Sequence, residues 1–598
     1  MDRRAALLAL FLATGLACKP PAPQDFNLPP GDVGTTDTGP GPVQCRPGMT
    51  LCNGNESYQC TADGEPVNRV ACSGASPICV PGIGCRLCRP GGSRCDPMRP
   101  QQTQTCRSDG MGYDNGLLCN PSGGQTCNNG SCMDRCSDSA LGRSYLGCDY
   151  WGTTTANGQL DARFEYAIVV SNPQTYPVEA TVEGGALPMP RALSLRPGEV
   201  QIVRLPWVPE LVEFNPALPP CRGGEPGGCA GNVPARSVLR PRGAYHLHAN
   251  GPVAAYQFNP LNFERAGGYH SFTNDASLLL PQGVLTSRYI VSTAPNWRTP
   301  SPMGIFLGGF VAIVGVTGES TTVTVRLSAS ISAGAGVSAA SAGTTQTYRL
   351  QPGDVVQLVG TGEGDLTGTT INATNPVAVF VGHDCTNVPN NRPACDHLEE
   401  QLFPNETWGR EYVVSALRDR GPMFPSVIRI VSQSDNNQVT FDPPTVRAPA
   451  TLRAGQVLEF ATTASFRVAG TSALLVAQYM LGQGPASATS SGAGDPAMVF
   501  EVPSQQFRSS YDIYVPETYT SNFINVVAPV RAEVTMDGMP LRGSMETVGP
   551  WAVYYLPIRA GAHHLQSGTP FGIKVYGIAQ YTSYMYPGGL DLQLITPG

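Results

Sequence analysis

One stretch of the chain, residues 382–404, combines residue types that can bind a metal or move protons. It reads GHDCTNVPNNRPACDHLEEQLFP, in a sequence of which only 14% is charged. His383 and Cys385 lie two residues apart. Cys395 and His397 repeat that spacing, so on strands each pair would share one face. Two histidines and two cysteines form a ligand set for tetrahedral zinc, but the same two cysteines would close a short loop if they formed a disulfide.

We favour the disulfide, because thiols of exported proteins tend to oxidise and turn-forming residues separate the two cysteines. Those turn-forming residues are Pro389, Asn390, Asn391 and Pro393. We therefore expect neither a metal nor a cofactor here. The carboxylates of the stretch leave two other hypotheses open, a calcium site of oxygen ligands and the acid/base pair of a surface glycoside hydrolase. These carboxylates are Asp384, Asp396, Glu399 and Glu400.

Other signatures of catalysis are missing from the sequence. It contains no Gly-x-Ser-x-Gly elbow, no His-Glu-x-x-His motif, no phosphate-binding loop of the GxxxxGK[ST] type and no dinucleotide-binding glycine motif. We therefore expect no enzyme activity. The formal charge is −7, and Lys19 and Lys574 are the only lysines. Without a basic patch, a nucleic-acid partner is not expected.

Length and composition indicate several domains that are rich in turns. The chain has 598 residues, which corresponds to several domains of ~100–200 residues each. Its 68 glycines and 55 prolines favour short turns over long helices.

The first 44 residues have the composition of an export signal followed by a tether. We interpret residues 1–18 as a lipoprotein signal peptide with Cys18 as the lipid-bearing residue, although Gly15 stands where the usual pattern has leucine. Gly15-x-Ala17 also suits ordinary signal peptidase. The chain has 19 cysteines, and without Cys18 the number is even, as a fully oxidised protein requires. Residues 19–44 are rich in Pro, Gly and Thr and are typical of a flexible tether.

Residues 45–136 form two similar cysteine-rich repeats, 45–87 and 88–136. Both open with Cys-Arg-Pro-Gly and carry Asp-Gly shortly after their third cysteine. Six cysteines per repeat are typical of modules too small for a hydrophobic core. The sequence does not choose among the fifteen pairings that six cysteines allow. Cys136 and Cys148 are expected to pair with each other, and zinc binding is the less favoured alternative for the repeats.

From about residue 149, short runs rich in Val, Ile, Thr, Tyr and Phe alternate with turn residues, which predicts an all-β fold. A larger unit repeats four times, with expected copies at about 150–285, 286–408, 409–510 and 511–598. Each copy has a strand led by a tyrosine, a Leu-x-x-Gly turn and an apolar closing strand. The leading tyrosines are expected at Tyr166, Tyr289, Tyr412 and Tyr514. The turns are LRPGEV (195–200), LQPGDV (350–355), LRAGQV (452–457) and, more loosely, PIRAGAH (557–563).

Each copy is large enough to be a β-sandwich, and blades of one propeller-like array are the alternative. The first copy also carries an insertion in which Cys221 and Cys229 would close a small loop. The predicted architecture is therefore a series of tandem sandwich-like repeats preceded by small disulfide-rich modules.

The run CDHLEEQLFPNETWGREYVV (395–414), preceded by NPVAVFVGHDCTNVP (375–389), resembles the N-terminal domain of IgG Fc-binding proteins. The residues that match the motif are Asp396, His397, Leu398, Glu400, Gln401, Pro404, Trp408 and Gly409. The opening and the end of that domain are similar to GCDYWGTTTAN and VYGIAQYTSYMYPGG, so the resemblance covers about 147–589. The cysteine-rich repeats resemble those of myxobacterial surface lipoproteins. These resemblances imply a surface-displayed, disulfide-bonded β-protein that binds or adheres, and we do not carry immunoglobulin binding over.

Our leading hypothesis is a non-enzymatic bacterial surface lipoprotein. A lipid on Cys18 would hold it at the outer membrane, the cysteine-rich modules would act as a stalk, and the β region would present a binding surface to an unknown protein or glycan. The alternatives are the surface hydrolase that uses carboxylates near 384–400 and a purely structural component of the envelope or matrix.

Overall fold

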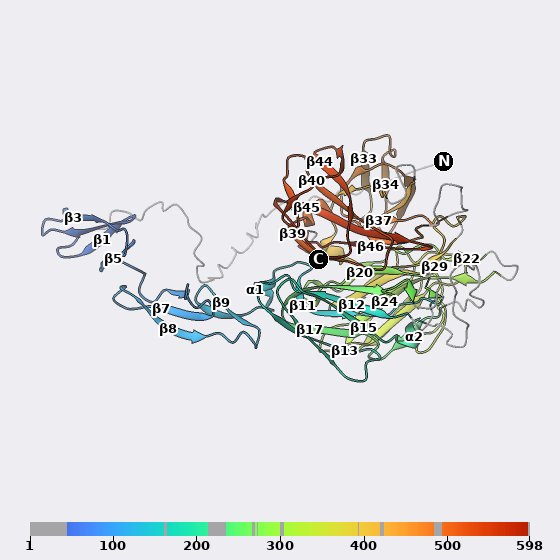
Figure 1. The fold of residues 1–598 in the computed structure, drawn as a ribbon, viewed down its shortest axis with the longest axis horizontal. Helices are drawn as coiled ribbons and strands as arrows, with labels where there is room; N and C mark the ends of the chain where they lie inside the picture. The colour runs from blue at the N-terminus through green and yellow to red at the C-terminus, as the bar shows by residue number, and fades with distance from the viewer. Residues whose placement is uncertain are drawn as a thin grey trace, which may run out of the picture. The chain divides into compact units, whose positions relative to one another are not determined.

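The computed structural model describes residues 45–158, 160, 164–212, 235–265, 269–271, 273–299, 304–392, 394–418, 424–483 and 493–595. In these ranges the fold is nearly all β, as predicted (Figure 1). The helical elements are short, namely α1 (Asp138–Leu141), α2 (Pro209–Val212) and the 3-10 turns η1 (Gln282–Val284), η2 (Asn405–Thr407) and η3 (Ser504–Gln506). Within the same ranges, no helix has the length and apolar character that crossing a bilayer requires. The described residues form two compact units, one from 45–92 with 106–113 and the other from 93–105 with 114–595.

The cysteine-rich repeats are small sheets stapled by cystines. The first repeat contains β1 (Thr50–Asn53), β2 (Glu56–Cys60), β3 (Pro66–Ala71), β4 (Ile78–Val80) and β5 (Gly84–Arg86). The second contains β6 (Ser93–Cys95), β7 (Gln102–Cys106), β8 (Tyr113–Leu118), β9 (Gln125–Asn128) and β10 (Ser131–Asp134). Both repeats pair their first cysteine with the third, the second with the fifth and the fourth with the sixth. The disulfides are Cys45–Cys60, Cys52–Cys79, Cys72–Cys85, Cys88–Cys106, Cys95–Cys127 and Cys119–Cys132.

The rest of the second unit contains four copies of one sandwich of two antiparallel sheets. The second copy comprises β21 (Arg288–Ile290), β24 (Gly309–Gly315), β25 (Thr321–Arg326), β26 (Thr345–Leu350), β27 (Val355–Val359), β28 (Thr370–Ala373), β29 (Val377–Thr386) and β30 (Asp396–Gln401). Its sheets have the orders β21-β28-β25-β26 and β16-β27-β24-β29-β30, in which the added strand β16 (Val238–Arg240) comes from the chain before the second copy.

The third copy repeats this topology in β31-β36-β33-β34 and β35-β32-β37-β38. Its strands are β31 (Glu411–Val414), β32 (Ser426–Ser432), β33 (Asn437–Asp442), β34 (Ala450–Leu452), β35 (Val457–Thr462), β36 (Phe466–Gly470), β37 (Leu474–Tyr479) and β38 (Met498–Phe500). A buried cluster that includes Tyr412, Ile428 and Phe466 fills the space between the two sheets.

In the first and fourth copies, one long strand serves both sheets. The first copy comprises β11 (Gly147–Gly152), β12 (Tyr166–Ser171), β13 (Val178–Gly184), β14 (Arg191–Leu195), β15 (Val200–Leu205), the long β17 (Tyr245–Asn259) and β20 (Asp275–Leu278). The fourth comprises β39 (Arg508–Val515), β40 (Ser521–Pro529), β41 (Val534–Met536), β42 (Met539–Pro540), β44 (Trp551–Ile558), the long β45 (Gly561–Ala579) and β46 (Thr582–Pro587). The additional strands are β16 (Val238–Arg240), β18 (Glu264–Arg265), β19 (Tyr269–His270), β22 (Trp297–Arg298), β23 (Phe306–Leu307) and β43 (Ser544–Val548).

One buried tyrosine holds the first strand of every copy to the closing strand. The Tyr412 hydroxyl accepts a hydrogen bond from the Gly409 amide at 3.3 Å and donates one to the carbonyl oxygen of Leu474. The equivalent hydroxyl groups donate to carbonyl oxygens of the other closing strands. These donor and acceptor pairs are Tyr150 with Val253, Tyr289 with Val377, and Tyr511 with Phe571.

Two of the expected tyrosine positions were wrong. Tyr166 lies on β12, the second strand of its copy, and Tyr514 lies three residues beyond the position of the structural equivalent, Tyr511. The PIRAGAH turn was also misplaced, because it joins β44 to β45, whereas the other three turns precede β15, β27 and β35.

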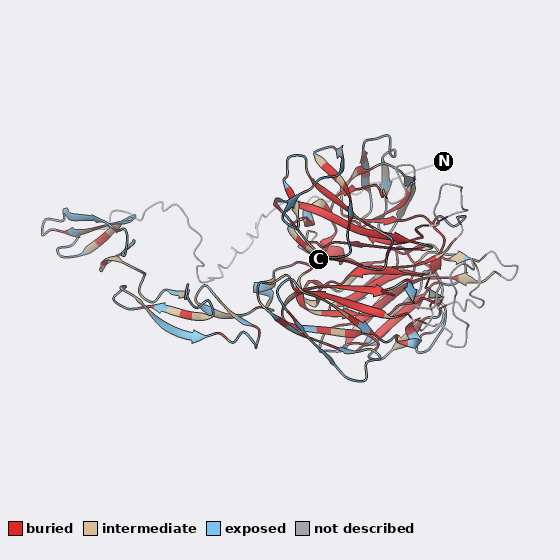
Figure 2. Cartoon of the chain, viewed as in Figure 1, coloured by how far each residue is buried: buried red, intermediate tan, exposed pale blue. Residues whose placement is uncertain are grey.

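The last strands of the four copies form a closed ring at the centre of this body. β20 contacts β46 and β30, and β38 contacts the same two strands. Backbone hydrogen bonds also join the chain before the first copy to the chain after the fourth, from Tyr145 to Leu590 and from Leu592 to Arg143, both at 3.0 Å. The copies are therefore sandwiches, as predicted. They are arranged in a closed ring, which is the property that the alternative of a propeller-like array also predicted. Burial in the second unit is concentrated in the strands of these sandwiches (Figure 2).

Candidate functional site

The ionisable residues that the sequence analysis selected within 382–404 lie on β29 and β30, and their side chains are buried. Both strands are buried along their whole length, because β30 belongs to the central ring and β29 pairs with it. The ionisable residues with no exposed surface are His383, Asp384, Asp396, His397, Glu399 and Glu400. The structure thus gathers these residues in the interior of the second unit.

Glu399 is the best-satisfied carboxylate of this group. Its oxygens accept hydrogen bonds from Gln257 and Ser277, both at 2.6 Å, and from Asn259 at 2.7 Å. Thr155 donates another at 2.9 Å. Burial alone would raise the pKa of Glu399, but the neighbouring His397 and these donors outweigh it, so the pKa is lowered. Glu399 is thus a buried anion that joins the second copy to three strands or loops of the first.

The adjacent Glu400 has the opposite environment. Neither of its carboxyl oxygens has a hydrogen-bond partner of good geometry among the described residues. Burial, with the negative charges of Asp275 and Glu399, raises the pKa of Glu400 well above its usual value. Burial and the charges of Asp495 and Asp275 also raise the pKa of Asp396. Glu400 and Asp396 therefore favour the protonated form.

Asp275, which the sequence analysis missed, connects all four copies. Its carboxylate accepts hydrogen bonds from backbone amides of the other three ring strands. The donors are Glu399 and Met498, both at 3.1 Å, and Met585 at 3.2 Å. The amide of Ala276 adds a fourth bond at 3.0 Å. An aspartate that opens a buried strand, as in DASLLL, is the only local signal that marks this residue.

The two histidines of the motif are core residues. The ring of His397 stacks on Phe310 with ring centroids 5.8 Å apart, and its Nε2 atom lies 3.3 Å from the Thr155 hydroxyl. Burial lowers the pKa of His383 to about 3, so this ring is neutral at physiological pH. Cys385 and Cys395 are bonded to each other, which leaves neither sulfur free to bind zinc. Across the described ranges, no group of three or more His, Cys, Asp or Glu side chains is arranged to hold a metal ion.

The remaining motif residues lie on β30 and in the chain between the second and third copies. Trp408 is buried, and its indole N–H donates to the carbonyl oxygen of Phe403 at 3.0 Å. At Gly409 a Cβ atom would lie 2.3 Å from a carbon of Pro503, so only glycine fits there. The side-chain oxygen of Gln401 accepts a hydrogen bond from the amide of Leu280 at 2.7 Å. Leu398 is fully buried.

All sixteen cysteines of the described residues are paired in eight disulfides. Cys136 is bonded to Cys148. The expected pair of Cys221 and Cys229 and the lipid-bearing Cys18 lie outside the described residues.

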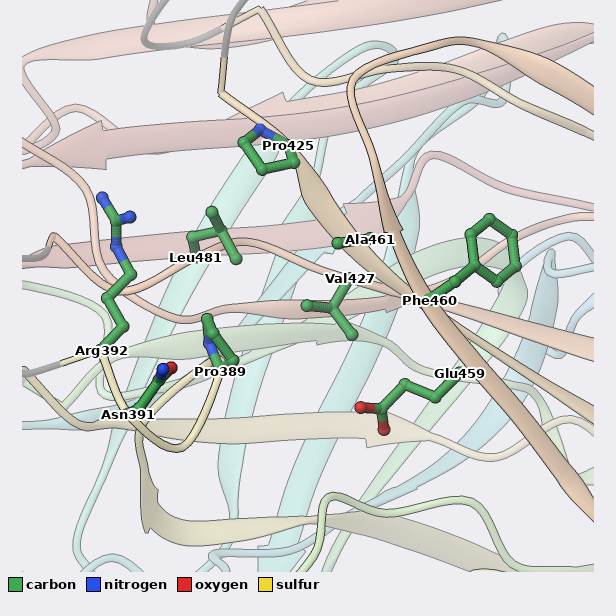
Figure 3. A pocket seen from close by; sticks show the side chains of 9 residues that line it. All are labelled: Pro389, Asn391, Arg392, Pro425, Val427, Glu459, Phe460, Ala461 and Leu481. Carbon is green, nitrogen blue, oxygen red and sulfur yellow. The ribbon is translucent and has the colours of Figure 1, made fainter. Parts of the chain in front are cut away.

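The accessible feature next to the motif is the tip of the loop that the Cys385–Cys395 disulfide closes. Pro389, Asn391 and Arg392 of this tip line a pocket of about 490 Å³ that opens against the third copy. The opposite wall comes from β32, β35 and the chain after β37 and consists of Pro425, Val427, Glu459, Phe460, Ala461 and Leu481. In the close-up, Arg392 and Glu459 lie on opposite sides, with Pro389, Leu481 and Val427 between them (Figure 3).

A second pocket of about 310 Å³ continues along the same loop and shares Pro389, Asn391, Val427 and Glu459 with the first. The guanidinium of Arg392 fixes the loop by donating to the carbonyl oxygens of Gly482 and Gln483. The joined hollow, which we call the loop pocket, is mostly apolar. The buried motif therefore positions a loop whose tip forms one wall of an open pocket.

The sequence that forms these copies is similar to a known protein family. The family model described as IgGFc binding protein matches residues 275–577. The chain belongs to the IgGFc-binding family. The match begins at Asp275 and contains the second and third copies and most of the fourth. The protein named IgGFc-binding protein of Homo sapiens is 24% identical over 332 residues, which are 54% of this chain and 6% of the human protein. The chain thus aligns with only a small part of that relative.

Proposed function

We propose that this member of the IgGFc-binding family is an exported binding protein whose ligand surface is the loop pocket. The observation that carries the proposal is the contrast between the two ends of one segment. Cys385 lies on β29 and Cys395 directly precedes β30, and both strands are buried along their length, whereas the tip of the cystine loop lines an open pocket between two copies. A rigid, mostly apolar hollow with a few polar groups is what a binding site requires.

The burial of the carboxylates favours binding over hydrolysis. A glycoside hydrolase needs two carboxyl groups that reach the substrate and the attacking water. Asp384, Asp396, Glu399 and Glu400 have no exposed surface, and none of them lines the loop pocket. Glu399 is moreover occupied by donors from the first copy.

We further propose that a lipid on Cys18 holds the protein at the outer surface of a bacterial cell, with residues 19–44 as a tether and the cystine modules as a stalk. Small modules held by disulfides are typical of proteins in oxidising compartments, which supports export. Labelling of expressing cells with radioactive palmitate should mark the wild-type chain and leave Cys18→Ser unlabelled. An unlabelled wild-type chain would refute the anchor.

The ligand surface is tested with Asn391→Trp, which places a large side chain at the exposed loop tip without touching the core. Glu319→Trp, on an exposed turn of the second copy, is the matched control. The probes are a random peptide library, a glycan array and a purified IgG Fc fragment. We expect at least one saturable binder that Asn391→Trp weakens tenfold or more and that Glu319→Trp leaves unchanged. A panel without any saturable binder, or a binder that Asn391→Trp retains fully, would contradict the proposal.

A further inference from the structure

One wall of the loop pocket is the outer edge of a sheet. In two other copies of the fold, a further strand covers the equivalent edge. The strands β15, β27, β35 and β44 occupy equivalent places, each paired with the central strand of its sheet. On β27 the outer edge is covered by β16, which runs antiparallel to it, and on β44 it is covered by β43. Among the described residues, no strand pairs with the outer edge of β35.

The hydrogen-bond phase shows which backbone groups of β35 point outward. The amide of Ser432 donates to Gln456 at 3.3 Å, so these two residues form a hydrogen-bonded pair just before β35. In antiparallel sheets such pairs alternate with pairs whose N–H and C=O groups point away from the partner strand. The outward-pointing backbone groups of β35 therefore belong to Val457, Glu459 and Ala461.

The covered strand β27 has the same phase. The amide of Gly315 donates to Asp354 at 3.0 Å, which directs the backbone of Val355, Gln357 and Val359 outward. The amide of Val359 indeed reaches out to the hydroxyl of Ser237, just before β16, at 2.9 Å. By the matching Leu-x-x-Gly turns, Ala461 is the equivalent of Val359. The pairing of β16 with β27 therefore shows which kind of segment the equivalent edge of β35 would bind.

The loop pocket opens onto this edge. Glu459, Phe460 and Ala461 are consecutive residues of β35, and all three line the pocket. Successive side chains of a strand point to opposite faces of the sheet, so a pocket that meets three in a row lies beside the strand edge. The apolar side chains of Pro389, Val427 and Leu481 form the neighbouring wall.

We propose that the outer edge of β35 binds an extended peptide of a partner protein as an added antiparallel strand, with an apolar side chain of the peptide in the loop pocket. Backbone hydrogen bonds to Glu459 and Ala461 would supply affinity, and the pocket would supply selectivity, as in other cases of strand addition. This inference rests on the proposed function and assigns a ligand class to the same pocket. The internal model for the ligand is β16, whose sequence around Val238 and Leu239 is RSVLRP.

The test uses the intact protein and a fluorescent peptide of residues 235–241, ARSVLRP. We expect saturable binding, and we expect at least a tenfold loss when alternate peptide amides carry N-methyl groups, because these groups remove the donors that pair with the edge. This comparison leaves the protein unchanged. Equal binding of the methylated peptide, or no binding of either peptide, would overturn the proposal.

A protein variant gives an independent measurement. Ala461→Pro removes one outward N–H without removing a bond to β32 and should weaken peptide binding about tenfold. Arg204→Pro makes the same change at the equivalent position of β15, whose outer edge also has no paired strand among the described residues but does not line the loop pocket. Arg204→Pro should bind the peptide as the wild type does. Unchanged binding by Ala461→Pro would overturn strand addition, whereas a different ligand that still depends on Asn391 would leave the proposed function standing.

Discussion

The carboxylate of Asp275 in the first copy accepts a hydrogen bond from the backbone amide of Met498 in the third copy at 3.1 Å. The two residues lie on opposite strands of the central ring, since β20 and β38 each contact β30 and β46. A contact between residues so far apart in the sequence cannot form before the copies assemble. The ring is therefore a cooperative feature, and its polar centre holds the four sandwiches in one arrangement.

Replacement of Asp275 should destabilise the whole ring. In Asp275→Asn, an amide NH₂ group would face two of the four backbone donors, which leaves buried N–H groups without acceptors. We expect a loss of about 2–5 kcal/mol in the free energy of unfolding. Denaturant unfolding measures it, with Asp435→Asn as a control at an exposed turn, where the side chain accepts a bond from Ala454 at 3.0 Å. Equal stabilities of Asp275→Asn and the control would refute the role of Asp275 in holding the four copies together.

Glu400→Gln should stabilise the protein increasingly as pH rises. The pKa of Glu400 is raised in the folded state, so the folded protein retains a proton that the unfolded chain loses above about pH 4.3. Wild-type stability therefore decreases with pH in this window, and the neutral amide removes the decrease. The difference between variant and wild type should grow by about 1.4 kcal/mol per pH unit until the raised pKa is reached. A difference independent of pH would contradict the buried state of Glu400, whose carboxyl oxygens have no partner of good geometry among the described residues.

Glu399→Gln should have the opposite effect, although the two residues are adjacent. The pKa of Glu399 is lowered in the folded state, so its contribution is present above about pH 4.3 and is lost as pH falls through the folded pKa. At neutral pH we expect the variant to be about 2–4 kcal/mol less stable, because its NH₂ group replaces one acceptor oxygen and meets either the donors of Gln257 and Ser277 or those of Asn259 and Thr155. In acid unfolding titrations the deficit should shrink. A neutral or stabilising effect at pH 7 would show that Glu399 is not a bound anion.

Removal of one repeated tyrosine hydroxyl should cost the same in each copy. Tyr412→Phe and Tyr289→Phe each lose a bond to a buried carbonyl oxygen, for an expected loss of about 1–2 kcal/mol. The control is Tyr348→Phe, because the buried hydroxyl of Tyr348 has no hydrogen-bond partner in the described part of the chain. That change should be neutral or stabilising. Similar losses in all three variants would remove the special role of the repeated tyrosine.

Opening the loop disulfide should affect both stability and binding. Joint replacement of Cys385 and Cys395 by alanine frees a ten-residue separation, and chain entropy predicts a loss of about 2–3 kcal/mol. The loop tip, which forms one wall of the loop pocket, would then be less rigid. Thermal unfolding checks the first effect, and binding of the ARSVLRP peptide checks the second. A variant that matched the wild type in both respects would show that the disulfide does not organise the pocket.

Patterns that depend on local spacing were predictable from the sequence. Alternating Val, Ile and Tyr runs with glycine turns predicted the all-β class, and repeated closing strands predicted sandwich-like units. The leading tyrosine of the first copy was missed because Tyr166 stands at the expected spacing while Tyr150 fills the role. Spacing fails there because the copies differ in loop length.

The environment of the motif was not predictable, because it depends on contacts across the ring. Nothing local distinguishes Glu399, which meets donors from the first copy, from Glu400, which meets none of good geometry. Asp275 has the same difficulty, since its partners lie on three other copies. The pocket requires the third copy to stand beside the loop, which the sequence cannot specify.

Hydrogen exchange on the intact, ligand-free protein tests the central claim most directly, namely that the motif is a buried scaffold and the loop tip a binding wall. We predict that amides of β30, from Asp396 to Gln401, exchange only on global unfolding, whereas amides of Asn390, Asn391, Glu459 and Ala461 exchange rapidly. Rapid exchange along β30, or slow exchange at Glu459 and Ala461, would contradict the account. The first result would mean that the motif is an accessible site, and the second that the edge is already covered.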